Sequence, residues 1–278
     1  MEHQAFLILK KFKICCYQKM KIKPFELSSS YHQSMYQFEF SVFTLVNNQG
    51  QYEKLLNSLD KAGFNETNSE FCYLDNRSKN NYDGYSGLNK AIHISKGKYI
   101  ILIHQDVRLE FDNINDLRQK IQEIHAKDHN WAVLGNAGGN NDLGEKFIRI
   151  SDPANKNLSL GQIPAKVLSL DENFILLKSS SQITFSNDMN GYHFYGTDIC
   201  QQAIFQGYSC YVIDFHLLHL SSGNKDQSYI DGKKRLIQNY QKKLSPRFLR
   251  TTTCRLFLSG SRLFNLLFNQ KDLLFILR

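Results

Sequence analysis

The stretch GLNKAIHISKGKYIILIHQDVRL, residues 87–109, decides the fold. Apolar residues at helical spacing open it, over residues 87–95. An apolar, β-branched run follows at residues 99–103 and is typical of a buried strand. The strand stops at three polar residues, 104–106. A helix, a strand and a polar strand end therefore follow one another here.

The same alternation extends to both sides of this stretch. Strands are expected at residues 40–46, 71–74 and 131–134, with helices at 51–62 and 114–124. Strand–helix alternation predicts an α/β fold with a mostly parallel central sheet flanked by helices. Ligands of such sheets bind beyond the carboxyl ends of the strands. Polar residues stand at these ends, although Asn and Asp also favour ordinary turns; they are Asn47, Asp75, Asn76, His104, Gln105 and Asp106.

The second half of the chain is less regular. A strand pair interrupted by Asp171 and Glu172 is expected at residues 167–178, a helix at 195–207 and a strand at 209–213. A loop is expected at 135–144, and an amphipathic basic helix at 228–244. We divide the chain into a leader without assigned order (1–37), a main domain (38–227) and a basic amphipathic helical tail (228–278).

Composition points to a globular protein of the cytoplasm. Of the 278 residues, 42% are hydrophobic and 22% are charged. No stretch reaches the ~20 apolar residues that cross a bilayer. Lysines follow the short apolar patch at residues 5–9, which reverses the charge order of a secretory signal. The six cysteines form no CxxC pair, so free thiols are expected.

The positive charge is concentrated in the tail. The net charge is +8, but residues 233–278 hold eleven Lys and Arg and one acid, which leaves −2 for the rest of the chain. This distribution disfavours a nucleic-acid-binding core and favours a tail that meets an anionic partner. Large apolar residues lie among these bases, a pattern that suits a helix on an anionic membrane surface. The alternative is that they pack on the domain or on a second copy.

Three segments together resemble a known family. They are FSVFTLVNN at residues 40–48 with CYLDNRS at 72–78, the stretch at 87–109, and GYHFYGTDICQQAIFQGYSCYVIDFHLLHLSSG at 191–223. Their order and spacing resemble the family 2 glycosyltransferases with the GT-A fold. The nearest branch looks like the streptomycin-biosynthesis glycosyltransferase-like domains. The resemblance spans about two thirds of the chain.

The resemblance implies a hexosyltransferase that uses a sugar nucleotide. The donor would be a nucleotide-diphosphate sugar, UDP-sugar first, and the acceptor a glycan or lipid-linked hydroxyl. Inversion at the anomeric carbon and a place in cell-surface polysaccharide synthesis are implied as well. The Gln-x-x-Arg-Trp motif of processive synthases is absent, which favours single additions. The enzyme is expected in the cytoplasm, on the inner face of the membrane.

The resemblance also implies a divalent metal, Mn²⁺ or Mg²⁺, beside the diphosphate. Asp106 and His219 are its expected ligands, and imidazole suits Mn²⁺ better than Mg²⁺. The family's usual acid–x–acid motif reads His104-Gln105-Asp106 here, so one carboxylate remains. His219 could instead be a structural histidine at a strand end.

Asp198 is the expected general base, in the place where the family carries Glu-Asp. It stands near a helix start, where the helix dipole favours an ionised carboxylate. It could also serve as the N-cap of that helix. Lys90 could be a solvated helix charge, and the aromatic residues before the helix could belong to the core. Donor contacts are expected from Asn47, Asp75, Asn76, Asn89, Lys90, His104 and Gln105. Acceptor or sugar contacts are expected from Asp171, Glu172, His193 and Tyr195.

Three other functions compete with this interpretation. A nucleotidyltransferase would be expected to carry a Gly-rich basic loop after the first strand, and residues 47–50 hold one glycine and no base. A non-catalytic nucleotide-sugar-binding module is compatible with the reduced metal motif. A nucleic-acid arm in the tail would lack any recognised motif.

Overall fold

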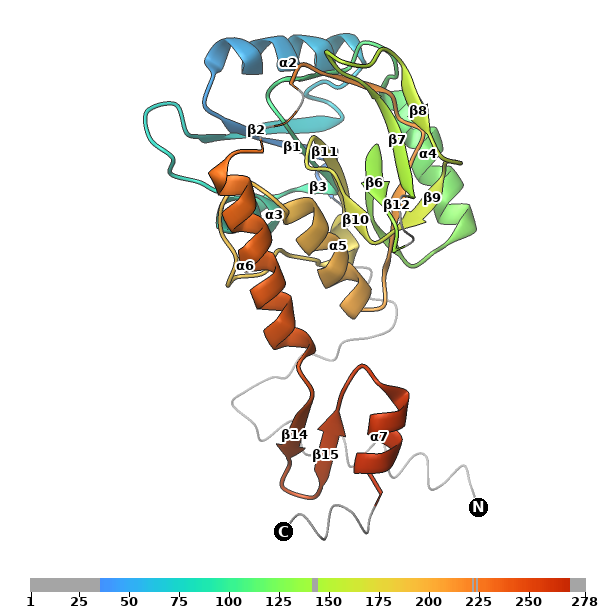
Figure 1. Ribbon diagram of the computed structural model, residues 1–278. Helices are drawn as coiled ribbons and strands as arrows, with labels where there is room; N and C mark the ends of the chain where they lie inside the picture. Colours follow the sequence, from blue (N-terminus) through green and yellow to red (C-terminus); the bar gives the residue numbers. More distant parts are fainter. Residues whose placement is uncertain (1–35, 142–144, 222, 224, 271–278) are drawn as a thin grey trace, which may run out of the picture. The chain divides into compact units, whose positions relative to one another are not determined.

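The computed structural model describes residues 36–141, 145–221, 223 and 225–270 (Figure 1). Almost all of the expected leader, residues 1–37, therefore lies outside the described residues. The main domain and the tail fall within them, apart from the short gaps and the final residues of the chain.

A mixed central sheet forms the framework of the domain. Its strand order is β2-β1-β3-β11-β5-β12-β9. The strands are β1 (Phe38–Val46), β2 (Ser69–Asp75), β3 (Gly97–Ile103), β5 (Trp131–Gly135), β9 (Ala165–Val167), β11 (Phe174–Lys178) and β12 (Ser209–Val212). β1 runs parallel to β2 and β3, and β5 runs parallel to β12. β11 is antiparallel to both of its neighbours, β3 and β5.

Helices cover both faces of this sheet (Figure 1). Successive residues of a strand point to opposite faces. Val42 of β1 thus packs in one core with Leu55 of α2 (Gln49–Lys61) and with α4 (Ile114–Lys127). Phe43 packs in a second core with α3 (Ser86–Ile94) and α5 (Tyr195–Phe205). The predicted α/β fold class, with helices flanking a central sheet, is confirmed; three of the six neighbouring strand pairs in that sheet are parallel and three are antiparallel.

A second sheet, in the order β10-β6-β7-β13-β4, was only partly predicted. Its strands are β4 (Val107–Arg108), β6 (Ala137–Gly139), β7 (Lys146–Ser151), β10 (Ser169–Leu170) and β13 (Leu217–His219), and β8 (Leu158–Leu160) pairs with β7. The expected loop at residues 135–144 contains β6. These strands are short and half-buried, so their pairing depends on distant partners more than on local pattern. Pairing of His219 with Val107 brings two distant segments together.

The tail begins as predicted and then departs from the prediction. α6 (Gln227–Leu244) matches the expected basic helix, and Asp226 caps its start. A hairpin of β14 (Arg247–Arg250) and β15 (Arg255–Leu258) follows, then the short helix α7 (Arg262–Phe268). The expectation of a helical tail is therefore wrong at residues 247–258. Pro246 cannot continue the helix, and residues 251–253 are β-branched threonines, which are weak helix formers. Among the described residues, no helix is both long and apolar enough to cross a bilayer.

Candidate functional site

A cavity of about 1010 Å³ opens beyond the carboxyl ends of β1 and β3. Asn47 directly follows β1, and His104 directly follows β3; both line it. The second sheet closes another side with Gly138 of β6 and His219 of β13. The cavity therefore lies where the sequence placed a ligand site, and its size suits a ligand larger than a single sugar.

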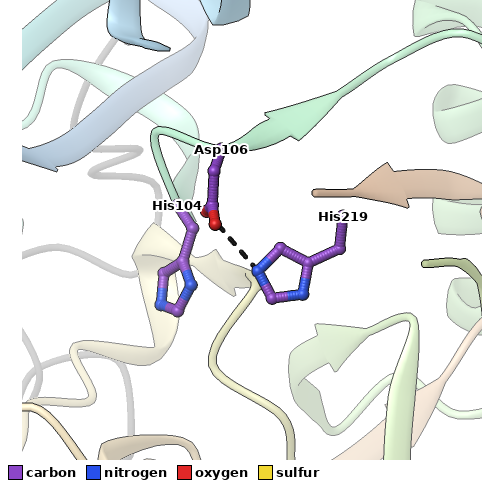
Figure 2. Close-up of side chains that lie close together, drawn as sticks. All are labelled: His104, Asp106 and His219. Atoms are coloured by element: carbon purple, nitrogen blue, oxygen red, sulfur yellow. Dashed lines mark ion pairs between the residues drawn. The ribbon is translucent and has the colours of Figure 1, made fainter. Parts of the chain in front are cut away.

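Three side chains in this cavity form a cluster of metal-ligand type. One ligand atom each from His104, Asp106 and His219 lies within 4.8 Å of the others (Figure 2). The Nε2 atom of His219 is 3.4 Å from Oδ1 of Asp106. The backbone fixes this approach, because the amide of Leu220 donates to the Asp106 carbonyl at 3.0 Å. The predicted pair Asp106 and His219 is brought together, and His104 joins it.

The charges in this cluster suit metal binding. Burial acts to raise the pKa of Asp106, but the hydrogen bond and charge of His219 hold that pKa well below its usual range. Burial lowers the pKa of His104, and the neighbouring His219 lowers it further. Against the effect of burial, the Asp106 carboxylate raises the pKa of His219. Asp106 is thus ionised and His104 neutral, the states in which these groups bind metal, and a bound metal would displace the proton that Asp106 favours on His219.

Hydrogen bonds orient the His104 ring for this role. The Tyr195 hydroxyl donates to the Glu172 carbonyl at 3.2 Å. Nε2 of His104 lies 2.7 Å from the same hydroxyl oxygen, and with the hydroxyl proton on the Glu172 carbonyl it is Nε2 that donates in this contact. Nδ1 then keeps its lone pair, the form in which a histidine binds metal while its other nitrogen is held. The residues therefore fit a divalent metal, and a set with two imidazoles favours Mn²⁺ over Mg²⁺.

His104 had been assigned to donor contacts, and its place in the cluster was missed. The available signal was its position as the first residue of the acid–x–acid-like triplet, because imidazole can replace a carboxylate as a ligand. The middle residue, Gln105, ties the triplet to β1. Its Oε1 accepts from the amides of Asn47 at 3.1 Å and Asn48 at 2.9 Å, and its Nε2 donates to the Asn47 side chain.

The structure contradicts the assignment of Asp198 as general base. Its side chain is fully buried, and it is not among the described residues that line the cavity. Its carboxylate accepts from the Ser186 amide at 2.7 Å, the Ser186 hydroxyl at 2.5 Å and the Tyr240 hydroxyl at 2.7 Å. It is not the N-cap of α5 either, which is Phe194. Helical geometry turns residue 198 inward, whereas Thr197 faces the cavity.

Glu172 is the carboxylic acid best placed to handle a proton. It lines the cavity together with Asp171. Burial raises the pKa of Glu172 from 4.5 to about 8, and the charge of Asp171 adds to this rise. The Gly196 amide donates to its Oε1 at 3.3 Å. The Asp171 carboxylate instead accepts from the backbone and side-chain nitrogens of Asn173, at 2.9 and 2.6 Å.

Several expected donor contacts lie elsewhere. Asp75 forms an ion pair with Arg77 at 2.8 Å, which lowers the pKa of Asp75 to about 2, and it is absent from the described cavity lining. Asn89 binds the backbone of Phe185 through both side-chain atoms, at 3.0 and 2.8 Å. Lys90 places Nζ 5.4 Å from the centre of the Tyr82 ring. Neither Asn89 nor Lys90 belongs to the described cavity lining.

Asn76 does line the cavity, but its side chain organises the loop that follows it. Its Oδ1 accepts from the amides of Asn81 and Tyr82, each at 2.9 Å, and its Nδ2 donates to the Tyr82 carbonyl at 2.8 Å. These bonds use most of the hydrogen-bonding capacity of the amide. Of the predicted donor residues outside the His104–Asp106 triplet, Asn47 is therefore the best placed to contact a nucleotide.

Aromatic residues surround the remaining wall. His193 and Tyr195, the expected acceptor contacts, line the cavity, and Tyr192, Phe194 and Tyr229 line it as well. His193 is held by Ser228 of α6, whose Oγ lies 3.0 Å from Nε2, and its ring meets that of Tyr229 at 5.5 Å. The contribution of α6 was missed because the sequence assigned this helix to the tail.

Comparisons with solved structures give weak likenesses. TarS of S. aureus matches with a TM-score of 0.46 and 14% identity over 75% of this chain, which spans 44% of the length of that protein. A mannosyltransferase of Pyrobaculum calidifontis in complex with GDP-Man and Mn²⁺ matches with a TM-score of 0.48 and 12% identity, over 87% of this chain and 72% of that one. GalNAc-T7 with UDP, GalNAc and Mn²⁺ matches with a TM-score of 0.46 and 8% identity, over 66% and 44%. Likenesses at this level carry no conclusion about the chemistry of this chain.

The comparison of sequences is stronger. No protein-family model matches the chain. A protein of Fuscovulum blasticum named "ATP synthase subunits region ORF 6" is 35% identical over 226 residues, which cover 80% of this chain and 91% of that protein. Identity at this level over most of both chains shows common descent. The chain therefore belongs to the same family as the ATP synthase subunits region ORF 6 protein of Fuscovulum blasticum.

Proposed function

We propose that this protein is a metal-dependent glycosyltransferase of the GT-A type, akin to family 2, that takes its sugar from a nucleotide-diphosphate donor. The observation that carries the proposal is the cluster of His104, Asp106 and His219 in a large cavity beyond β1 and β3. The sequence resemblance independently supports a donor diphosphate beside this triplet. A UDP-sugar is the donor we would test first.

The residues around the cluster divide the work of binding. A divalent metal held by these three side chains would neutralise the charge that grows on the departing diphosphate. Asn47, fixed by Gln105, is placed to contact the nucleoside. Tyr195 keeps the His104 ring in one orientation, so the site is organised before the donor arrives. The aromatic wall at His193 and Tyr229 offers flat faces to an acceptor sugar.

Glu172 takes the role first given to Asp198. In the proposed step the acceptor oxygen forms a bond to the anomeric carbon while the bond from that carbon to the diphosphate oxygen breaks. The acceptor proton passes to the Glu172 carboxylate. A pKa near the working pH is what efficient general base catalysis needs. One displacement from the side opposite the leaving group inverts the anomeric configuration, and a glycan or lipid-linked hydroxyl fits as acceptor.

The first test is donor binding. A thermal-shift screen of UDP- and GDP-sugars with and without Mn²⁺ should show stabilisation that requires both components, because a ligand of the folded state raises its apparent stability. Asp106→Asn should abolish this joint effect and keep the fold. Asp60→Asn, an exposed carboxylate on α2, is the matched control. A full joint shift in Asp106→Asn would refute the proposed donor site.

A non-catalytic nucleotide-sugar-binding module is the second candidate. It is favoured by one observation, that the cluster contains a single carboxylate. Both candidates predict donor binding, so binding cannot separate them. Slow Mn²⁺-dependent hydrolysis of a bound UDP-sugar, sensitive to Glu172→Gln, would identify an enzyme. Tight binding without hydrolysis or transfer to any acceptor would identify the module.

A further inference from the structure

The segment formed by β14, β15 and α7, here called the tail module (residues 247–268), exposes far more apolar surface than it buries. Phe257 is its one buried hydrophobic side chain, at 7% exposure. The Phe257 ring packs at a tilt against those of Phe248 and Phe268, with ring centres 4.8 Å away in both cases. Eight large apolar side chains of the module are between 38% and 66% exposed: Phe248, Leu249, Leu256, Leu258, Leu263, Phe264, Leu266 and Leu267.

These exposed side chains lie on two surfaces of the module. Residues Phe248 and Phe257 pair across the hairpin, and Phe268 of α7 packs against them, so α7 buries Phe257 on that face and leaves Phe248 53% exposed. Residues alternate in direction along a strand, so the leucines at 249, 256 and 258 project from the opposite face. Leu263 and Leu266 of α7 are 60% and 66% exposed. Within the described residues, these leucines have no large apolar surface to cover them.

Positive charge accompanies this apolar surface. No Asp or Glu occurs from Gly232 to Gln270, whereas nine bases do: Lys233, Lys234, Arg235, Lys242, Lys243, Arg247, Arg250, Arg255 and Arg262. A second copy docked through the module would bring arginines against arginines with no carboxylate to separate them. An anionic lipid surface offers both phosphate groups for the arginines and an apolar layer for the leucines.

We propose that the tail module docks on an anionic lipid bilayer, with its exposed leucines in the boundary between headgroups and acyl chains. α7 has seven residues and the hairpin strands have four each, so the module lies in the interface and does not span it. Arg250 and Arg262 would contact lipid phosphates. The inference does not depend on sugar transfer and stands if that proposal fails.

Vesicle flotation of the full chain tests the proposal. Vesicles of equal parts phosphatidylglycerol and phosphatidylcholine should carry the protein upward at low salt, and vesicles of phosphatidylcholine alone should not. Raising the salt to ~0.5 M should weaken the binding, because the Debye length shortens to a few ångströms. Absence of binding to the anionic vesicles, or equal binding to both kinds, would overturn the proposal.

Paired variants locate the contact. Leu263→Ser with Leu266→Ser should weaken vesicle binding at least roughly tenfold, since each leucine loses its apolar transfer. Arg250→Gln with Arg262→Gln should weaken it by roughly tenfold or more at low salt, and by much less at high salt. Ile94→Ser with Leu160→Ser removes apolar side chains that are 62% and 44% exposed elsewhere in the domain, and should change nothing. Circular dichroism confirms that each variant is folded.

If something other than lipid covers the exposed leucines of the tail module, these experiments give different results. If another part of the chain covers the leucines, the full-length protein will ignore anionic vesicles. If a second copy covers them, light scattering will give a dimer that the Leu263→Ser, Leu266→Ser pair dissociates, and vesicles will not compete with dimer formation. Either result overturns the lipid proposal. A monomer that floats with anionic vesicles and is released by the leucine pair supports it.

Discussion

Asp106, in the turn after β3, and Asp198, in the first turn of α5, were both expected to act in the site. The structure gives them different surroundings. Asp106 follows β3, faces the cavity and meets an imidazole at 3.4 Å. Asp198 lies in the first turn of α5 and is fully buried. Both carboxylates are well partnered, so hydrogen bonding alone does not mark a catalytic acid. Access to the cavity distinguishes them.

The Asp198 network joins three parts of the domain. Ser186 comes from the segment before α5, and Tyr240 comes from α6. Lys243 of α6 also donates to the Ser186 hydroxyl at 2.6 Å. Burying a carboxylate costs free energy unless hydrogen bonds replace its contacts with water, so the folded state depends on these three bonds. This network therefore attaches α6 to α5, and α6 in turn supplies Ser228 and Tyr229 to the aromatic wall.

The largest expected effect is a difference in transfer rate between variants of Glu172 and of Asp198. Glu172→Gln should lower the transfer rate by about 10²–10⁴, the usual loss when a general base is removed, with donor affinity nearly unchanged. Asp198→Asn should retain most activity per folded molecule, because its carboxylate does not face the cavity. Single-turnover transfer from a UDP-sugar measures the rate, and calorimetric titration measures donor binding. Loss of transfer in well-folded Asp198→Asn, with an active Glu172→Gln, would reverse our assignment.

Replacing Asp106 or Asp198 by alanine should lower the unfolding free energy of the protein by different amounts. Asp198→Ala leaves buried donors from Ser186 and Tyr240 without an acceptor, which should cost about 3 kcal/mol of unfolding free energy. Asp106→Ala removes the hydrogen bonds to His219 and Ser221 from a largely buried cluster and should cost less, about 1–2 kcal/mol without metal. Urea unfolding in the presence of a chelator gives both values. Equal losses would mean that Asp106 is as structural as Asp198.

The fold was predictable because its signals are local. The strand and helix periods of residues 40–134 appear in the sequence and agree with β1, α2, β2, α3, β3, α4 and β5 to within a few residues. β7 and β8 were not predicted, since short half-buried strands are defined by their partners. The hairpin at residues 247–258 was missed for the same reason, because Phe248 and Phe257 meet only after the chain turns.

The candidate site was predictable where it depends on strand ends and not where it depends on side-chain direction. Asn47, His104, Gln105, Asp106 and His219 meet because parallel strands end together and β13 pairs with β4. Which residue of the helix beginning at residue 195 turns inward is decided by packing. A sequence motif could not show that Asp198 is sealed by a tyrosine 42 positions later. Likewise, the spacing of the motif could not show that Asp75 pairs with Arg77 instead of facing the cavity.

Tyr195 contacts the metal-ligand cluster through His104, whereas Tyr240 contacts the buried Asp198. Tyr195→Phe removes the oxygen that orients His104 and should weaken Mn²⁺ binding by about tenfold or more. Tyr240→Phe removes the hydroxyl on Asp198 and should leave Mn²⁺ affinity unchanged while lowering stability by about 1 kcal/mol. Calorimetric titration with Mn²⁺ and urea unfolding measure the two properties. The hypothesis fails if Tyr240→Phe weakens Mn²⁺ binding more than Tyr195→Phe does.

The pH dependence of stability should reveal the contribution of Glu172. Folding raises the pKa of Glu172 from 4.5 to about 8, so between these values the folded protein holds a proton that the unfolded chain has lost. The contribution is fully present below the unfolded pKa and disappears as pH rises through the folded pKa, so the metal-free protein should lose stability between about pH 5 and pH 8. Glu172→Gln should decline less over this range, by roughly 4 kcal/mol, because about 1.4 kcal/mol accompanies each pH unit between the two pKa values. Glu53→Gln, on the exposed surface of α2, should follow the wild-type curve. Parallel curves for wild type and Glu172→Gln would show that Glu172 is ionised in the folded state throughout, and would remove the pKa argument for its role as base.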